Sequence, residues 1–310
     1  MAMPEIFGGV VPPLCTPFTT DGAIDLASLE RLVDYQINGG ATGIFALGST
    51  SEAGAMSDAQ RREVLEHTVK FVNGRVPVLA GVIAMSTGST IDYANMAEEL
   101  GADAIVAVGP FYIRPSQEEV KKHFRLIHAA TTLPIMAYHI PFNVQTVITT
   151  ETLTELASEG LIAGVKDSSG EEANFREIVK AMRAFPHVSV FTGSELTVDY
   201  AMFTGADGVV PGLGNVDPAG YRRLYDACVS GDWDAAKAEQ ARLTALFAII
   251  RQATPGRVGF TSSALGGFKT ALRELGVIDT NEMATPMTPL NDEEAGRIRD
   301  VLIAAGLNPK

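Results

Sequence analysis

The sequence predicts an α/β fold, a (β/α)8 TIM barrel followed by a C-terminal helical extension. Short runs rich in valine, isoleucine and leucine alternate with amphipathic helical stretches along the first two thirds of the chain. Apolar strands separated by helices are typical of a parallel sheet that helices cover. The expected strands lie at residues 9–17, 43–48, 76–82, 104–109, 134–140, 162–166, 188–192 and 208–211. Eight such βα units make a closed barrel.

The entries to these strands repeat, and the repeat favours a closed, symmetric barrel over an open sheet. A glycine that ends a helix leads by a tight turn into a strand at residues 40–44, 101–105 and 205–209, with a weaker copy at 160–162. A doubly wound sheet is the alternative. However, no GxGxxG motif follows the first strand, so a dinucleotide site has no support.

Helical patterns separate the strands and then continue without strands to the end of the chain. Between strands, helices are expected at residues 58–72, 88–100, 117–130 and 171–184. After residue 212 only amphipathic helices are expected, at residues 217–229, 232–253, 260–275 and 291–305. We therefore predict a barrel domain over residues 1–230 and a helical extension over residues 231–310.

Composition and charge exclude several classes of function. The net charge of −13 opposes general binding to nucleic acid or to an anionic membrane surface. No apolar run reaches 18 residues, and the N-terminus lacks the basic and apolar regions of a secretory signal. Cys15 and Cys228 have no CxxC partner, so we expect reduced core thiols in a cytoplasmic protein that does not enter a membrane.

Lys166 is the one lysine that closes an apolar run, at the end of residues 162–166. The other seven lysines fall in polar, helix-patterned segments or at the chain end: Lys70, Lys121, Lys122, Lys180, Lys237, Lys269 and Lys310. Removing an ammonium group from water lowers its pKa and frees the neutral amine as a nucleophile. The alternative is a lysine that extends its charge into solvent. This stretch by itself does not decide between the two.

Polar residues gather where the expected strands end, which is where a barrel carries its active site. The turn at residues 48–51 offers successive N–H groups and hydroxyls that suit a carboxylate, although such a turn more often caps the next helix. Tyr112 and Tyr138 offer phenols for proton transfer, although a lone tyrosine there more often only packs. Side chains alternate along a strand, so His139 faces away from Tyr138 and is interpreted as a packing residue. The histidines show no HxH or HExxH spacing, so no metal site is expected.

Four motifs then carry a family resemblance: GSTSE at 48–52, FYIRPSQ at 111–117, YHIP at 138–141 and GVKDSSG at 164–170. In their order and spacing, the chain resembles the dihydrodipicolinate synthase/N-acetylneuraminate lyase family over essentially its whole length. The resemblance implies a (β/α)8 barrel with a C-terminal helical extension. It also implies a homotetramer built as a dimer of dimers.

The resemblance further implies the chemistry of the site. Lys166 would form a Schiff base with pyruvate or another 2-oxo acid, without a separate cofactor, and the iminium would act as an electron sink. Tyr138 would transfer protons, and Ser49 would link it to Tyr112 of a neighbouring subunit. Ser49 and Thr50 would hold the carboxylate. Contacts to the rest of the substrate are expected from the strand-end residues Asn143, Ser168, Gly193, Glu195 and Val210.

Departures from the family pattern narrow the substrate. Synthases of the lysine pathway usually carry an arginine shortly after YNVP, but here Pro141 is followed by Phe142 and Asn143. Sialic acid lyases place an acidic pair after the glycine of the seventh strand, whereas here only Glu195 remains. Ser51 also replaces the glycine usual in GTTGE or GSTGE. The KDSSG motif most resembles members that act on 2-keto-3-deoxy sugar acids or 4-hydroxy-2-oxo acids.

The leading hypothesis is a Schiff-base aldolase that reversibly cleaves a 2-keto-3-deoxy sugar acid, or a 4-hydroxy-2-oxo acid, to pyruvate and an aldehyde. A dehydratase that uses the same iminium is one alternative. A 4-hydroxy-tetrahydrodipicolinate (dihydrodipicolinate) synthase is another. From a different class, a non-catalytic sensor or binding protein on the same barrel remains, although binding alone requires neither Lys166 nor Tyr138.

Overall fold

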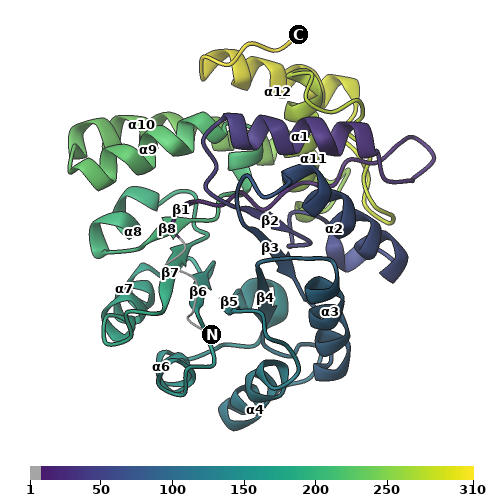
Figure 1. Ribbon diagram of the computed structural model, residues 1–310. Helices are drawn as coiled ribbons and strands as arrows, with labels where there is room; N and C mark the ends of the chain where they lie inside the picture. Colours follow the sequence, from purple (N-terminus) through teal and green to yellow (C-terminus); the bar gives the residue numbers. More distant parts are fainter. Residues whose placement is uncertain (1–7) are drawn as a thin grey trace.

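The computed structural model describes residues 8–310 and contains a single sheet of eight parallel strands surrounded by helices (Figure 1). Neighbouring strands follow the order β1-β8-β7-β6-β5-β4-β3-β2. The strands are β1 (Gly9–Val10), β2 (Ile44–Ala46), β3 (Val78–Gly81), β4 (Ala104–Val108), β5 (Ile135–His139), β6 (Gly164–Asp167), β7 (Ser189–Thr192) and β8 (Gly208–Val209). The predicted TIM barrel is therefore confirmed.

The seam between the first and second strands closes the barrel. After β1 the chain runs on to a parallel bridge between Pro13 and Phe45, and Leu14 N–H donates to Phe45 O at 2.9 Å. The expected first strand, 9–17, is regular only over its first two residues, because the prolines after it cannot donate to a ladder. On the other side of β1, a Cβ on Gly208 would lie 2.4 Å from Gly9 O, so only glycine fits there.

Helices cover the outside of the barrel. They are α1 (Leu26–Asn38), α2 (Asp58–Val72), α3 (Thr87–Glu99), α4 (Gln117–His128), α6 (Thr150–Ser158), α7 (Glu172–Met182) and α8 (Val198–Thr204). Ser57 and Ser116 begin α2 and α4 with capping boxes, in which a side chain at the third helical position returns to the cap. Three single turns lie at the strand ends: η1 (Ala53–Ala55), α5 (Pro141–Val144) and η2 (Gly212–Asn215).

Two apolar clusters form the core. The larger cluster lies between the sheet and the helices and includes the buried free thiols of Cys15 and Cys228. The smaller cluster fills the barrel interior with side chains from alternate strand positions: Val11, Phe45, Leu79, Ala104, Val106, Val108, Met136, Tyr138, Ile140, Val144, Phe191 and Val210. Tyr138 therefore faces the interior of the barrel.

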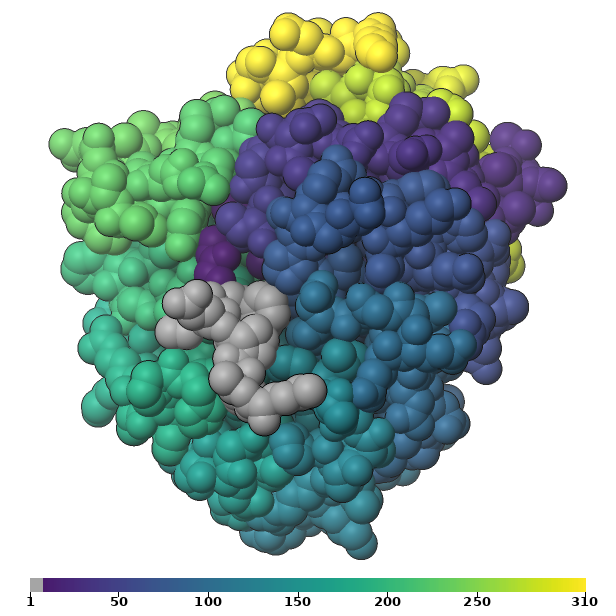
Figure 2. All heavy atoms as spheres, in the orientation of Figure 1, coloured from purple at the N-terminus to yellow at the C-terminus, as the bar shows by residue number. Residues whose placement is uncertain are grey.

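The C-terminal helices gather on one side of the barrel, next to α1 (Figures 1 and 2). They are α9 (Pro218–Ser230), α10 (Trp233–Leu246), η3 (Phe247–Arg251), α11 (Phe260–Glu274) and α12 (Asp292–Ala304). The single helix expected over 232–253 thus changes to 3-10 geometry after Leu246. Arg31 of α1 ties this region to the barrel by donating to Val277 O at 3.1 Å and pairing with Asp279 at 2.5 Å. The domain boundary at residue 230 stays a prediction.

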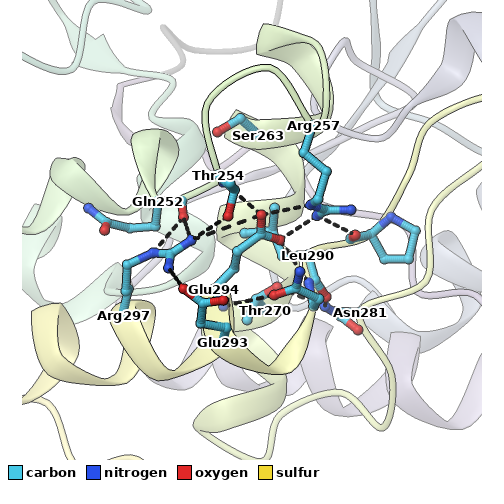
Figure 3. Close-up of polar contacts among 12 residues, drawn as sticks. Gln252, Thr254, Arg257, Ser263, Thr270, Asn281, Leu290, Glu293, Glu294 and Arg297 are labelled. Carbon is cyan, nitrogen blue, oxygen red and sulfur yellow. Dashed lines mark hydrogen bonds and ion pairs between the residues drawn. The ribbon is translucent and has the colours of Figure 1, made fainter.

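A buried carboxylate, Glu294, holds the loops of the extension together (Figure 3). It accepts hydrogen bonds from Arg257 Nε and from Thr254 N–H, both at 2.7 Å. Arg257 also donates to Pro289 O at 3.0 Å. These contacts connect the loop before α11, residues 252–259, to the loop after it, residues 275–291. Over residues 8–310, no helix is both long enough and apolar enough to cross a bilayer.

Candidate active site

Strand register places the predicted lysine beside the predicted tyrosine. Tyr138 of β5 lies opposite Lys166 of β6, and Lys166 lies opposite Phe191 of β7. On the other side, Tyr138 lies opposite Val108 of β4. These four residues occupy one level near the carboxyl ends of their strands, where barrel enzymes carry their chemistry.

Lys166 is a buried lysine without a carboxylate partner. Its side chain is 4% exposed, and Nζ lies 3.9 Å from the ring centroid of Tyr138 and 4.9 Å from that of Phe45. In the region from residue 8 to residue 310, Lys166 forms no salt bridge. Two of the lysines that fall in helix-patterned segments, Lys121 and Lys269, are also buried. Both of these are neutralised, by Glu155 at 2.6 Å and by Glu52 at 2.8 Å.

The turn after β2 presents free hydrogen-bond donors. The N–H groups of Ser51 and Glu52 turn back onto Gly48 O and Ser49 O. Within the described part of the chain, the N–H groups and hydroxyls of Ser49 and Thr50 bond to no protein group. The helix-capping alternative does not hold, because Ser57 caps α2. Ser51, which replaces the usual glycine, is accommodated by a hydrogen bond from its hydroxyl to Leu14 O at 2.5 Å.

Tyr112 lies apart from the other predicted catalytic residues. Its side chain is 93% exposed, and its backbone is left-handed with φ of 70°. A left-handed tyrosine is strained, and such strain persists only where the surrounding structure holds it. Across residues 8–310, Tyr112, Ser49 and Tyr138 form no hydrogen bonds with one another, so one chain does not contain the predicted relay.

The predicted substrate contacts fall at the ends of β5 to β8. Asn143 is exposed on α5, Ser168 follows β6, and Val210 lies buried just after β8. Gly193 follows β7, and a Cβ at this position would lie 2.1 Å from Ser168 Oγ and 3.1 Å from Lys166 Cε. The absence of a side chain at Gly193 therefore leaves room for Lys166 and Ser168.

Glu195 is a carboxyl group held close to Lys166. Its Oε1 accepts a hydrogen bond from Leu213 N–H at 2.6 Å. Burial raises the pKa of Glu195 to about 7, although the Leu213 N–H group and the charge of Lys166 act to lower it. A Cβ on Gly212 would lie 3.0 Å from this oxygen, so the glycine at 212 lets the carboxylate approach the turn. Near neutral pH this group is able both to accept and to donate a proton.

The residues that follow Tyr138 and Lys166 in the chain, His139 and Asp167, form a second buried pair. His139 lies opposite Asp167, with Nε2 3.9 Å from Oδ2, and His139 Nδ1 accepts from Ile148 N–H at 3.2 Å. Burial lowers the pKa of His139 and raises that of Asp167. His139 is thus directed away from the barrel interior, as the strand alternation predicts.

A cavity of about 430 Å³ opens at this end of the barrel. Its lining comprises Gly48, Ser49, Glu52, Ala53, Gly54, Ala55, Ile83, Val108, Phe111, Ile140, Asn143, Val144, Thr261, Leu265, Pro286 and Met287. Lys166 and Tyr138 are not in this lining but share the strand level of Val108. Glu52 is the single ionisable side chain of the lining, which contains no cation. The part of the lining that residues 261, 265, 286 and 287 form was not predicted. The prediction considered only residues at the ends of strands, and these four residues lie in the C-terminal extension.

Comparison with known proteins identifies the family. A sequence model of the dihydrodipicolinate synthetase family matches residues 6–305. The chain is 31% identical to a protein named 4-hydroxy-tetrahydrodipicolinate synthase from Gluconacetobacter diazotrophicus, over 97% of this chain and 98% of that relative. It is 38% identical to a protein of the same name from Xanthomonas axonopodis pv. citri, over 76% of this chain and 78% of that relative.

Solved structures give the same assignment. YagE, a prophage protein of the dihydrodipicolinic acid synthase family from E. coli K12 solved in complex with pyruvate, superposes with a TM-score of 0.91 at 27% identity, covering 98% of this chain and 100% of YagE. The pyruvate complex of the chloride-inhibited dihydrodipicolinate synthase from Acinetobacter baumannii gives 0.88 at 30% identity, covering 98% and 100%. The chain therefore belongs to the dihydrodipicolinate synthetase family of pyruvate-dependent class I aldolases and lyases, enzymes that form a Schiff base on a lysine and use no separate cofactor.

Proposed function

We propose that this enzyme reversibly cleaves a 2-keto-3-deoxy sugar acid, or a related 4-hydroxy-2-oxo acid, to pyruvate and an aldehyde. The observation that carries the proposal is the cavity at the carboxyl end of the barrel, which reaches the strand level of Lys166 through Val108 and whose lining has no cationic side chain. An aldehyde partner with its own carboxylate calls for a cation, whereas hydroxyl groups are served by amides, hydroxyls and a carboxylate. Asn143 supplies such an amide in the cavity lining.

The covalent step is assigned to Lys166. Its neutral amine adds to C2 of the 2-oxo acid, and the carbonyl oxygen leaves as water with a proton from the Tyr138 hydroxyl, which gives a cationic iminium and a tyrosinate. The N–H groups and hydroxyls of Ser49 and Thr50 hold the substrate carboxylate, which their lack of protein partners in the described chain supports. Pyruvate in the complexes of YagE and of the Acinetobacter baumannii enzyme supports it as the 2-oxo product.

Cleavage then uses the iminium as an electron sink. The Tyr138 tyrosinate accepts the proton of the C4 hydroxyl, the C3–C4 bond breaks, and the electron pair passes into the enamine as the aldehyde leaves. Protonation at C3 and addition of water to the iminium release pyruvate and restore the lysine. The 3.9 Å between Lys166 Nζ and the Tyr138 ring centroid supports this assignment.

The remaining strand-end residues are assigned to the sugar part of the substrate. Ser168 and Glu195 bind its hydroxyls together with Asn143, while Val210 forms an apolar wall. Gly193 leaves the space that the lysine needs.

The assembly is proposed to complete the site. Tyr112 reaches the Ser49–Tyr138 pair of a neighbouring subunit in a dimer, and two such dimers form a tetramer in the cytoplasm. Its 93% exposure and left-handed backbone support a partner outside its own chain.

A 4-hydroxy-tetrahydrodipicolinate synthase is the second candidate. It is favoured by the names of the relatives, which are 30 to 38% identical to this chain. The cavity lining argues against it, because aspartate semialdehyde brings a carboxylate of its own and the lining has no cation to bind one. A dehydratase would use the same iminium but expel a hydroxyl instead of an aldehyde.

Trapping tests the covalent step. Borohydride reduction in the presence of pyruvate is expected to add a pyruvate-derived mass to the peptide that contains Lys166, and Lys166→Arg is expected to show none. Peptide mapping by mass spectrometry is the measurement. An adduct on any other lysine would refute the assignment.

A substrate panel tests the reaction. Release of pyruvate with an aldehyde from 2-keto-3-deoxy acids is expected. Condensation of pyruvate with aspartate semialdehyde at a higher kcat/KM would favour the synthase. A deoxy-dioxo product without aldehyde would favour the dehydratase.

A further inference from the structure

The turn that carries Ser49 and Thr50 is bounded by two strained residues. Leu47 and Glu52 both have left-handed backbones, with φ of 57° and 62°, although neither is glycine. The turn also packs closely against β3, because a Cβ on Gly81 would lie 2.1 Å from Leu47 O. A turn under such strain needs fixed contacts on its other side, since strained conformations persist only where the surroundings hold them.

Those contacts come from the Glu52 carboxylate. Its Oε1 lies 2.8 Å from Lys269 Nζ of α11, and its Oε2 accepts a hydrogen bond from Ala284 N–H at 2.7 Å. Both side chains of the ion pair are fully buried. Each carboxylate oxygen is therefore committed to a group in the C-terminal region.

The buried ammonium group of Lys269 in turn has Glu52 as its charged partner. Its ammonium lies 4.4 Å from the ring centroid of Phe18, and Glu52 is its one salt-bridge partner in residues 8–310. Burial lowers the pKa of Lys269, against the attraction of Glu52. Neither charge has a second ion-pair partner there, so each fixes the position of the other.

The pair joins two walls of one cavity. Gly48, Ser49 and Glu52 line it on the barrel side, and Leu265, Pro286 and Met287 line it on the side of the extension. Leu265 precedes Lys269 by one helical turn on α11, and Pro286 follows Ala284 closely in the chain. The position of the extension wall is thus set by the carboxylate that also ends the donor turn.

We propose that Glu52 and Lys269 are positioning residues that hold the Ser49–Thr50 turn in the geometry that binds the carboxylate of the 2-oxo acid. This inference rests on the proposed function of that turn. Removing the ion pair lets the strained turn relax, so its N–H groups no longer converge on the carboxylate. The predicted consequence is weaker binding of pyruvate, with the chemistry of Lys166 retained at saturation.

The test uses the double variant Glu52→Gln/Lys269→Met in the full-length chain. Both substitutions preserve side-chain length, the new amide oxygen still accepts from Ala284 N–H, and no buried charge is left unpaired. The measurement is the pyruvate concentration that gives half-maximal borohydride-trapped adduct on Lys166. We expect it to rise at least about tenfold, because small displacements of positioning groups have effects of this size. The maximal extent of trapping is expected to stay near that of wild type.

The matched control is Lys121→Met/Glu155→Gln, which removes another lysine–glutamate pair from the outer helices α4 and α6. Its half-saturating pyruvate concentration should equal that of wild type. A merely structural role of Glu52 and Lys269 would lower the extent of trapping without moving the half-saturation point, and that result would overturn the inference. If the double variant does not fold, Glu52→Asp, which keeps both charges but shortens the carboxylate side chain by one methylene, is assessed by the same criterion. Absence of any adduct in wild type would instead refute the proposed function.

Discussion

At Gly193, the chain after β7 passes so close to β6 that a single methyl group meets two functional side chains. A Cβ there would lie 2.1 Å from Ser168 Oγ and 3.1 Å from Lys166 Cε. We expect Gly193→Ala to slow adduct formation with pyruvate about 10- to 100-fold, since a misplaced reacting group has effects of this order. The rate of borohydride trapping measures it.

Two further variants define the cause of that loss. Gly193→Ala/Ser168→Ala should recover part of the rate, because it removes the oxygen at the closest contact. Gly296→Ala on α12, where an added Cβ meets nothing within 4 Å, should leave the rate unchanged. A wild-type rate in Gly193→Ala would show that the space between β6 and β7 is not required.

Single residues were predictable where burial follows from the sequence pattern. Lys166 closes an apolar strand, and the structure buries it as expected. The burial of Lys269 was missed, because α11 reads as amphipathic although it is packed on several sides. The unpaired state of Lys166 could not be predicted either, since it depends on which carboxylates the fold brings near.

At the scale of elements, Glu294 at the start of α12 is expected to make the free energy of unfolding depend on pH in the acid range. Burial acts to raise its pKa, but Arg257 and the N–H groups of Thr254 and Asn291 outweigh burial and hold the pKa at about 2. A glutamate with a depressed pKa stabilises the fold above its ordinary value near 4.5 and loses this effect as the pH falls toward 2. The shift corresponds to about 3 kcal/mol.

Urea unfolding at pH 7 and pH 3 measures this contribution. Glu294→Gln should be less stable than wild type at pH 7 and should lose less stability on acidification. The control is Glu293→Gln on the same helical turn, whose side chain is 79% exposed and pairs only at the surface with Arg297. Its effect should stay below about 1 kcal/mol. Equal pH dependence in wild type and Glu294→Gln would contradict the expectation.

Elements of the barrel were predicted better than the walls of the cavity. Helix α2 lies at 58–72 as expected, because Ser57 and Gln60 form a capping box that is readable in the sequence. The regular strands are shorter than predicted where prolines interrupt the ladder. The contribution of Thr261 and Met287 to the cavity could not be predicted, since it depends on how the extension folds back onto the barrel mouth.

At the scale of the whole molecule, mixing two inactive variants tests whether subunits share a site. Lys166→Met retains Tyr112, and Tyr112→Phe retains Lys166. If Tyr112 acts on a neighbouring subunit, each hybrid dimer regains one complete site, so random exchange should restore activity at about one quarter of all sites. Turnover after mixing, unfolding and refolding together is the measurement.

Recovery of activity should follow the fraction of hybrids and should be absent when the variants are refolded separately. If Tyr112 acted within its own chain, mixing would restore nothing.

The repeated βα pattern predicts the barrel, and the family confirms it. The contact of Tyr112 with a neighbouring subunit stays a prediction, because a single chain does not contain it.

The ion pair between Glu52 and Lys269 also has a consequence for synthesis on the ribosome. Its two members stand 217 residues apart in the chain. Synthesis at about 5–20 residues per second separates their appearance by roughly 10–40 s. In the second half of that interval the nascent chain already contains the donor turn and Lys166, but the carboxylate of Glu52 still lacks its cation. Tight binding of pyruvate is therefore expected to arise late in translation, as a property of the nearly finished chain.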